Sequence, residues 1–351
     1  ITNVICNSAK QGLIPQREYF DKDIANSDNT SGYYIIEEND FVYNPRKSSD
    51  APYGPISSYK YPDAGIVSPL YLCFRAKGAI NPSFYEWYFR SSAWHRYVYM
   101  SGDSGARHDR VSIKDDVFFA MPISIPSARE QEHIASFLDM IDQRIDKQRA
   151  LVDNLKKYKR GVTNAIFNRK LIFSSEDSPY PQWEEKYIGD ICKIQTGKSN
   201  TQDETSQGIY PFYVRSPIVR KSNRYLLDCE AVLTVGDGVG TGKVFHYVQG
   251  RFDLHQRVYA MTDFKMVSGK YFYYYFAHFF YDRVMRMTAK TSVDSVRYEM
   301  IDRMTILVPC KEEQQKIVCF LDRIEKKIKN AEEELNLLEK NKSGFLQQLF
   351  I

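Results

Sequence analysis

The sequence contains one long motif twice. The stretch from Pro126 to Ile145 recurs from Pro309 to Ile328, and each residue lies 183 positions before its counterpart. The match continues without a gap to Phe167 in the first copy and Phe350 in the second. A repeat of this length marks a structural unit. Any fold for this chain must therefore accommodate the same element twice.

Apolar residues recur in both copies at alternating steps of four and three, which is the spacing of a coiled-coil seam. We predict two helices, each about 40 residues and roughly 60 Å long, that pair with each other because neither can bury its narrow stripe alone. Two repeats in the same order should be related by a pseudo-two-fold axis, so the simplest pairing is antiparallel. Two separate amphipathic helices are the alternative, disfavoured by the charged remaining faces. The predicted seam comprises Ile134, Leu138, Ile141, Ile145, Val152 and Leu155 in the first copy and Ile317, Leu321, Ile324, Ile328, Leu335 and Leu338 in the second.

Each helix follows a globular block, and the two blocks are much less alike than the helices. With 351 residues, the chain is long enough for several domains. We predict the fold class α+β, in which two mixed α/β domains are separated by two long helices that form an antiparallel coiled coil with a pseudo-two-fold internal repeat. The predicted boundaries are 1–125 for the first block, 126–170 for the first helix, 171–308 for the second block and 309–351 for the second helix.

Short β-forming runs between Gly-rich turns predict the strands of both blocks. Asn81 and Pro82 are typical of a helix start, as cap and first turn. In the first block we expect strands at 34–36, 40–43 and 65–74 and a helix at 82–100. In the second block we expect strands at 187–194, 231–235, 243–248 and 256–262 and a helix at 268–287.

Composition narrows the function classes. No run reaches the roughly 18 apolar residues of a membrane span, and no signal peptide opens the chain, so we expect a cytoplasmic protein without a membrane partner. Six scattered cysteines without a Cys-x-x-Cys pair predict reduced, mostly buried thiols and neither disulfides nor a metal site. The net charge of +4 permits nucleic-acid binding. Because the first residue is Ile1 instead of Met, we expect a segment before it.

No catalytic motif emerges. The Gly-rich segment from Gly236 to Lys243 departs from the nucleotide-hydrolysing phosphate loop at Asp237 and Val244. A tight hairpin between two strands explains the segment, and a Gly-rich loop ending in Lys also allows close approach to a phosphate. The Asn-Pro-Ser-Phe run at 81–84 is one residue from an amino-methyltransferase motif, but the Gly-rich cofactor motif is absent. We therefore predict a non-catalytic chain that carries no cofactor.

Basic and amide residues alternate with Tyr and Gly on the predicted loops. Arg and Lys neutralise phosphates, whereas Arg, Asn and Gln read base edges through paired hydrogen bonds. Any single one could be an ordinary solvated charge, but their concentration in both blocks favours nucleic-acid binding. We predict phosphate contacts for Lys243 and Lys290 and base contacts for Arg215, Gln256 and Arg257. The full candidate set is Asn44, Arg46, Lys47, Ser48, Arg107 and Arg110 in the first block, and Arg215, Arg220, Lys221, Arg224, Lys243, His255, Gln256, Arg257, Lys290 and Ser292 in the second.

The repeat also carries the motif E-Q-x-x-I-x-x-F-L-D, which starts at Glu130 and again at Glu313. Together with the seam and the two-block order, it resembles the specificity subunit of type I restriction-modification systems. The blocks resemble that family's target recognition domains in YNPRKSSDAPYGPI, GIVSPLYLCF, WEEKYIG and PFYVR. The resemblance covers essentially the whole chain. It departs at the first block, which lacks an equivalent of Trp183, so we expect that domain to be N-terminally incomplete.

The resemblance implies a DNA reader. Each recognition domain would contact one half of a bipartite, asymmetric double-stranded DNA site, and the helix pair would set the spacer. The chain would dock two methyltransferase subunits that bring S-adenosylmethionine, and through them restriction subunits that use ATP and Mg²⁺. Two alternatives stay open: a related system whose methyltransferase and nuclease are fused in one partner, and a coiled-coil adaptor that binds only proteins. Steep loss of DNA affinity with salt would exclude the adaptor.

Overall fold

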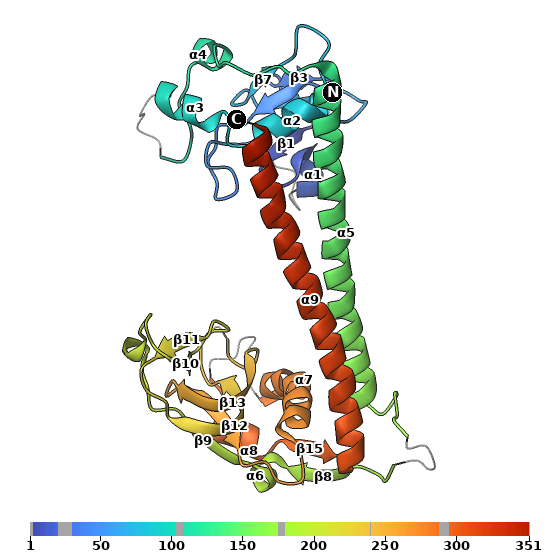
Figure 1. Cartoon of the computed structure of the whole chain (residues 1–351), viewed down its shortest axis with the longest axis vertical. Helices are drawn as coiled ribbons and strands as arrows, with labels where there is room; N and C mark the ends of the chain where they lie inside the picture. The colour runs from blue at the N-terminus through green and yellow to red at the C-terminus, as the bar shows by residue number, and fades with distance from the viewer. Residues whose placement is uncertain are drawn as a thin grey trace. The chain divides into compact units, whose positions relative to one another are not determined.

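The computed structural model describes residues 3–19, 30–102, 108–174, 180–238, 240–287 and 295–350. The chain divides into two compact units. The first unit comprises residues 1–150 and 332–351, and the second comprises residues 151–331. Each unit contains one globular block and a part of each long helix (Figure 1).

The block of the first unit combines small antiparallel sheets with short helices. β1 (Ile5–Ser8) pairs with β2 (Gly12–Pro15), β3 (Tyr34–Ile36) with β6 (Gly65–Val67), and β4 (Phe41–Tyr43) lies between β5 (Ile56–Ser58) and β7 (Leu72–Phe74). The helices are α1 (Gln16–Tyr19), α2 (Pro82–Arg90), α3 (His95–Ser101) and α4 (Asp115–Phe119).

Strand β4 is buried on both faces because its side chains alternate between two cores. Phe41 and Tyr43 face an aromatic cluster that includes Trp94. Val42 faces a second cluster with Ile36. This central position holds β5 and β7 in place, and the loop that follows β4 carries predicted site residues.

Two local predictions for this block were wrong. The predicted strand 65–74 is divided into β6 and β7 by a turn, in which Tyr71 N donates to Ser68 O at 3.0 Å. The predicted helix 82–100 ends at Arg90, because Ser91 takes an extended backbone conformation with ψ 174°, and α3 starts only at His95. The cap of α2 was predicted correctly, since Asn81 Oδ1 accepts from Phe84 N at 3.1 Å.

A six-stranded sheet forms the block of the second unit. Its order is β11 (Arg220–Ser222), β10 (Tyr210–Tyr213), β13 (Phe245–Leu254), β12 (Leu227–Val235), β14 (Val258–Thr262) and β9 (Lys193–Thr196). Only the β10–β13 pair is parallel among these neighbours. Antiparallel neighbours β12 and β13 flank the Gly-rich segment as predicted, but the nine positions 236–244 between them make the connection longer than a tight hairpin.

Helix α7 (Gly269–Met287) packs on strands β12 and β13 (Figure 1). Phe272, Phe276 and Phe280 recur at the helical spacing of four and are completely buried. Their rings stack at centroid distances of 5.4 and 4.3 Å. The helix predicted at 268–287 is therefore confirmed as the apolar cover of the sheet.

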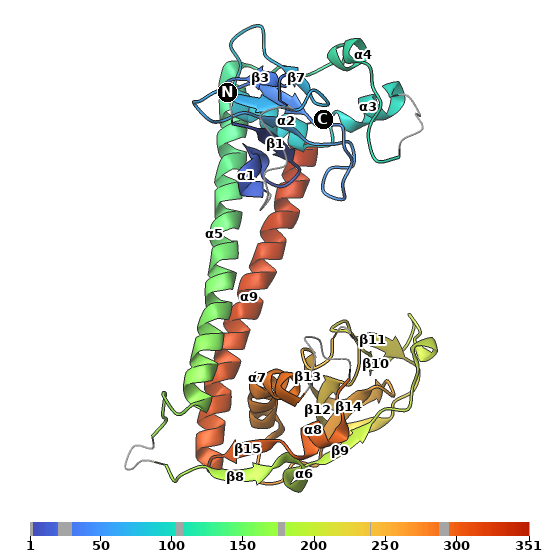
Figure 2. The same ribbon diagram turned by 180° about the vertical axis from the view of Figure 1, so that it is seen from behind.

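A second, two-stranded sheet closes this unit. β15 (Thr305–Val308) pairs antiparallel with β8 (Glu184–Tyr187), near α6 (Ile188–Ile191) and α8 (Tyr298–Asp302) (Figure 2). The single strand predicted at 187–194 was wrong, because α6 turns the chain between β8 and β9. Ile188 and Ile191, three residues apart, are buried on one side of that turn.

The two long helices are α5 (Ala128–Phe167) and α9 (Lys311–Leu349). In the first unit Arg144 Nη2 lies 3.2 Å from Glu334 Oε1, which pairs the beginning of α5 with the end of α9. In the second unit Lys159 Nζ lies 2.5 Å from Glu325 Oε1, which pairs the end of α5 with the beginning of α9. The predicted antiparallel pairing, and with it the predicted fold class, is confirmed.

The seam residues line this pairing. Leu138, Ile317 and Leu321 are completely buried. Ile145, Val152, Ile324 and Ile328 are buried, whereas Ile134, Ile141, Leu155, Leu335 and Leu338 are half-buried.

Two glutamines at the same repeat position tie each long helix to its own block. Gln131 Nε2 and Gln314 Nε2 each donate, at 2.9 Å, to the carbonyl of the proline five residues earlier. The side-chain oxygen of Gln131 accepts from Asn81 N at 3.4 Å, and that of Gln314 accepts from Ser268 N at 2.9 Å. Residues 81 and 268 directly precede α2 and α7. The repeated motif thus holds the start of each block helix.

An aromatic side chain completes the attachment in the first unit. Trp87 Nε1 donates to Asp139 Oδ1 at 2.8 Å. Lys342 Nζ lies 4.7 Å from the centroid of the Trp87 ring and forms an ion pair with Asp142. One block helix and both long helices therefore meet at a single tryptophan.

Equivalent contacts occur in the second unit. Tyr274 OH donates to Asp322 Oδ1 at 2.5 Å. Lys159 Nζ lies 5.6 Å from the Tyr274 ring centroid and pairs with Glu325. The repeat relates these acids and this lysine to those of the first unit, so the internal repeat extends to individual side-chain contacts.

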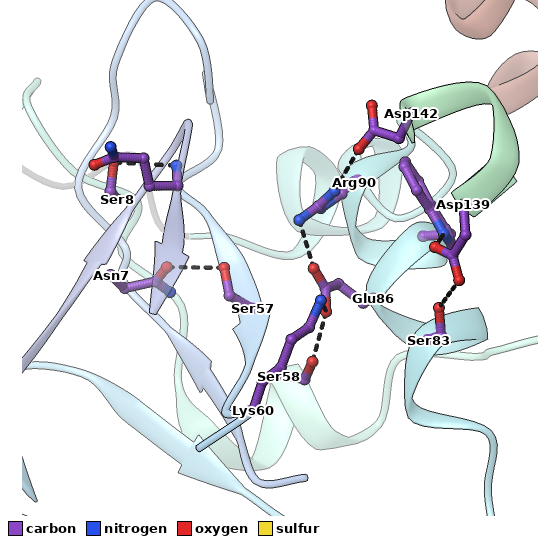
Figure 3. A network of polar contacts seen from close by, with 12 residues as sticks. Asn7, Ser8, Ser57, Ser58, Lys60, Ser83, Glu86, Arg90, Asp139 and Asp142 are labelled. Carbon is purple, nitrogen blue, oxygen red and sulfur yellow. Dashed lines mark hydrogen bonds and ion pairs between the residues drawn. The ribbon is translucent and has the colours of Figure 1, made fainter. Parts of the chain in front are cut away.

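A buried carboxylate further anchors α2 (Figure 3). Glu86 is 4% exposed and accepts from Ser58 Oγ at 2.6 Å, Lys60 Nζ at 2.9 Å and Arg90 Nη2 at 2.5 Å. Arg90 Nη1 lies 3.5 Å from Asp142 on α5. Because a buried charge is tolerated only when it is paired and hydrogen-bonded, this network fixes β5, α2 and α5 together.

Candidate nucleic-acid interface

Backbone hydrogen bonds bring the ends of several strands together in the second unit. His255 N donates to Tyr213 O at 3.0 Å, and Gly236 N donates to Arg257 O at 2.8 Å. A Cβ on Gly236 would lie 2.7 Å from Arg257 O, so glycine is required for this approach. The segments after β10, β12 and β13 therefore share one surface.

Two predicted base readers meet there at one carboxylate. Arg215 Nη1 lies 3.3 Å from Asp237 Oδ1, and Arg257 Nε lies 3.7 Å from Asp237 Oδ2. The side chain of Gln256 is exposed, while its backbone N donates to Ser199 O at 2.8 Å. Asp237 was not predicted as a site residue. In the sequence, only its place in the Gly-rich loop pointed to Asp237, because Arg215 and Arg257 lie far from it along the chain.

His255 lies beneath these arginines and is 4% exposed. Its Nδ1 accepts from Arg257 N at 3.0 Å. Burial lowers the pKa of His255, the charges of Arg215 and Arg257 lower it further, and Asp237 opposes them. A neutral imidazole with Nδ1 free to accept suits this hydrogen bond. His255, predicted as a DNA contact, thus holds the turn that presents Arg257.

Arg224 and Arg220 contact carboxylates of their own block. Arg224 lies 2.8 Å from Asp203 and 3.6 Å from Asp253, which is 1% exposed. Arg220 lies 3.3 Å from Glu204. A buried carboxylate such as Asp253 needs a paired charge, so Arg224 has a structural task besides any contact with DNA.

Lys221 and Lys243 are exposed. Lys243 Nζ lies 5.0 Å from the Tyr281 ring centroid. The preceding Gly242 has φ +67°, a backbone conformation that favours glycine. A compact ammonium held by a tight turn at the surface suits a phosphate contact.

In the first unit, a pocket of about 870 Å³ collects the predicted residues Asn44, Arg46, Lys47, Ser48 and Arg110. Lys10 and Asp50 also line it and form an ion pair at 3.6 Å. Its lining contains four basic side chains and one acidic side chain. The structure therefore gathers these predicted residues around one positively charged hollow.

Two segments form the wall of this pocket. Val111 N donates to Pro45 O and Lys47 N donates to Asp109 O, both at 2.8 Å, which places Arg46 opposite Arg110. This pairing explains why residues from distant loops line one pocket.

Asn44 and Ser48 shape the loop between β4 and β5. Asn44 Nδ2 donates to Asn7 O at 3.3 Å, and its Oδ1 accepts from Arg46 N at 3.1 Å. Ser48 Oγ accepts from the backbone N of Ala51 at 3.1 Å. Asn7 is fixed in turn by the Ser57 hydroxyl, which donates to its Oδ1 at 2.8 Å (Figure 3). Asn44 and Ser48 therefore position the basic residues beside them.

Three predicted residues, Arg107, Lys290 and Ser292, lie outside the described residues. In the part of the chain that the structure describes, no group of three or more His, Cys, Asp or Glu could hold a metal ion. None of the described helices is long and apolar enough to cross a membrane.

The cysteines are free, as expected, but only Cys192 is buried, and Cys319 is exposed. The expectation of mostly buried thiols was therefore wrong. Burial raises the pKa of Cys73 to about 11 and that of Cys192 to about 12, which keeps both thiols protonated at neutral pH.

The stability of the second unit should decrease as the pH falls from about 7 to about 5.5. Burial lowers the pKa of His246, His255 and His278 in the fold. The unfolded chain, with ordinary histidine pKa values, therefore binds protons first as the pH drops, and stability is lost. We expect the melting temperature to fall by several degrees. His278→Phe, which keeps a ring against Phe167, should reduce this dependence, and an unchanged pH profile in that variant would contradict the assignment.

Comparison with known proteins assigns part of the chain to a domain family. Residues 180–340 match the model described as type I restriction modification DNA specificity domain. A curated relative is the type I restriction enzyme EcoDI specificity subunit of Escherichia coli, which is 22% identical over 165 residues. The match assigns the second block and most of the second long helix to the type I restriction modification DNA specificity domain family. The alignment covers 47% of this chain and 36% of the Escherichia coli subunit, so it spans about a third of that relative.

Two solved structures share the fold of this chain. One belongs to a study of complex assembly and conformational transition of the type I restriction-modification system, with a TM-score of 0.59, 17% identity and coverage of 91% of this chain and 84% of that one. The other is the type I S subunit from M. genitalium, with a TM-score of 0.58, 14% identity and coverage of 94% and 87%.

Specificity subunits are the non-catalytic members of type I systems. The carboxylate-linked pair Arg215 and Arg257 and the exposed Lys243 lie inside the matched DNA specificity domain. The basic pocket of the first unit lies outside the matched residues. Both surfaces are candidates for DNA contact, and they use different residues.

Proposed function

We propose that this chain is the DNA-binding subunit of a type I restriction-modification complex and recognises a bipartite, asymmetric site in double-stranded DNA. Residues 1–125 and 171–308 act as target recognition domains, and each reads one half of the site. Residues 126–170 and 309–351 form the helical frame between them.

The observation that carries this proposal is the arginine surface at the end of the sheet in the DNA specificity domain. Arginine reads guanine through two hydrogen bonds, and lysine neutralises phosphates as a point charge. Arg257 is 63% exposed at its side chain and Arg215 is 49% exposed, so both can reach a ligand. The basic pocket around Arg46 in the first unit differs in residues and architecture. Two unlike surfaces favour two unlike half-sites.

We further propose that the chain acts in the cytoplasm and docks two methyltransferase subunits, which bring S-adenosylmethionine, and through them restriction subunits that use ATP and Mg²⁺. The match of residues 180–340 to the type I DNA specificity domain supports this assembly. Co-expression with candidate methyltransferase subunits, followed by purification through a tag on this chain, tests it. Recovery of one fused methyltransferase-nuclease would favour the related system instead, and recovery of neither would contradict the docking proposal.

Lysine and arginine variants should separate phosphate contacts from base contacts. Lys243→Ala should weaken binding to cognate and scrambled duplexes alike and reduce the slope of log affinity against log salt by about one. Arg257→Ala should cost roughly 1 to 3 kcal/mol on the cognate duplex, with little effect on the scrambled one. Competition binding at several salt concentrations measures both effects. A wild-type chain without salt-dependent duplex binding would instead favour the protein-binding adaptor.

A further inference from the structure

We propose that Asp237 is a positioning residue that holds Arg215 and Arg257 as a fixed pair for reading guanine edges in the half-site of the second recognition domain. The inference rests on the proposed DNA-binding function and deepens it. Asp237 is acidic, although its surface must approach a polyanion. Its proposed task is to favour arginine contacts with bases over arginine contacts with phosphates.

The geometry supplies the first argument. Asp237 uses a different oxygen for each arginine, with Oδ1 at 3.3 Å from Arg215 Nη1 and Oδ2 at 3.7 Å from Arg257 Nε. The contact to Arg257 engages Nε, so the two terminal nitrogens of that guanidinium stay available as a fork. Guanine presents O6 and N7 as a matching pair of acceptors in the major groove. The carboxylate thus leaves both terminal nitrogens of Arg257 available, whereas it engages one terminal nitrogen, Nη1, of Arg215.

The backbone around Asp237 is fixed on both sides. Gly236 N donates to Arg257 O at 2.8 Å, and Val296 N donates to Gly236 O at 2.6 Å. Asp237 itself forms an antiparallel bridge with Ser295. From below, the neutral ring of His255 holds Arg257 N at 3.0 Å. The segment that contains Asp237 is hydrogen-bonded to two other parts of the block. Asp237 is therefore held in place and can restrict the positions of the two arginine side chains.

Electrostatics gives a second argument. A free arginine is drawn to phosphates regardless of sequence, and this attraction supplies most of non-specific binding. An arginine already paired with a carboxylate gains less from a phosphate, and the carboxylate repels the phosphate as well. A base edge carries no net charge, so its hydrogen bonds to the arginine are penalised less. The side chain of Asp237 is 24% exposed, which lets its charge act on an approaching ligand.

The test uses the full chain and a pool of randomised duplexes. Sequences that the wild-type chain enriches define a cognate duplex, and a scrambled duplex of the same composition serves as reference. Asp237→Asn keeps the size of the side chain and removes its charge. The matched control is Asp228→Asn, since Asp228 pairs with Arg251 at 2.9 Å on the same sheet at a surface outside this cluster.

For Asp237→Asn we expect tighter binding to the scrambled duplex, a salt slope steeper by about one, and discrimination between the duplexes reduced about tenfold. The lost discrimination should fall on the G·C pairs that Arg215→Ala and Arg257→Ala also lose. Asp228→Asn should leave discrimination unchanged. Misfolding would weaken binding to both duplexes, so a gain on the scrambled duplex cannot come from structural damage.

Two results would overturn the inference. An equal increase in affinity for both duplexes would show that Asp237 only reduces the positive charge of the surface. A loss confined to one base pair that the arginine variants do not affect would make Asp237 a direct reader, for example of the cytosine amino group. If the wild-type chain enriches no sequence at all, the proposed function fails, and that outcome is distinct from failure of the Asp237 inference alone.

Discussion

Glu313→Ala should lower the free energy of unfolding by about 3 kcal/mol, because it breaks a buried charge pair. Glu313 is completely buried at the start of α9. It accepts from Arg169 Nη1 at 3.1 Å and from Trp183 Nε1 at 2.8 Å. Arg169 is 33% exposed and also lies over the Trp183 ring, so part of its charge can reach water. Because water can partly solvate Arg169 once Glu313 is removed, the expected loss of stability lies at the lower end of the range for broken buried ion pairs.

The internal repeat provides the matched control. Glu130 occupies the same position in the first copy but is exposed, so Glu130→Ala should change stability by no more than about 0.5 kcal/mol. Glu313→Gln keeps an oxygen for Trp183 and should give an intermediate loss. Urea denaturation with an unchanged m value is the measurement. Similar losses at positions 130 and 313 would show that burial and the Arg169 contact do not determine the cost.

Exchanging residues 171–308 for the equivalent domain of a relative should replace one half-site completely and leave the other unchanged. Strands β8 and β15 pair within this range, so both move together in the exchange. The recipient helices contribute Gln314 and Asp322, which bind Ser268 N and the Tyr274 hydroxyl of the domain. A donor that carries a tyrosine at the equivalent of position 274 preserves these contacts.

Sequencing of methylated sites in cells that express the chimaera measures the outcome. A donor domain with phenylalanine at that position serves as a folding control, because it loses the hydrogen bond to Asp322 and keeps the reading loops. Replacement of both half-sites, or of neither, would contradict modular recognition by the two blocks.

The helical frame was predictable because its periodicity is local. The seam of α5 and α9 repeats at the spacing of a coiled coil, and the ungapped repeat fixes where each copy starts. The helix at 269–287 was predictable because its apolar and aromatic residues fall on more than one helical face. Errors arose where a short apolar run bends. Residues 188–191 form a helical turn, and residues 68–71 form a β-turn between two strands, because tertiary contacts override weak local preferences.

The sequence by itself determined the duplicated frame, the two unlike blocks and the residue types of a DNA-binding surface, since these depend on period and composition. Only the tertiary structure decided the task of each side chain. Glu130 and Glu313 are equivalent in sequence, yet one is solvated and the other is buried against Arg169. Arg257 meets Asp237, whereas Arg224 meets the buried Asp253. Such pairings join residues from separate strands, and the distance between two charges is set by the packing of the sheet instead of by their spacing along the chain.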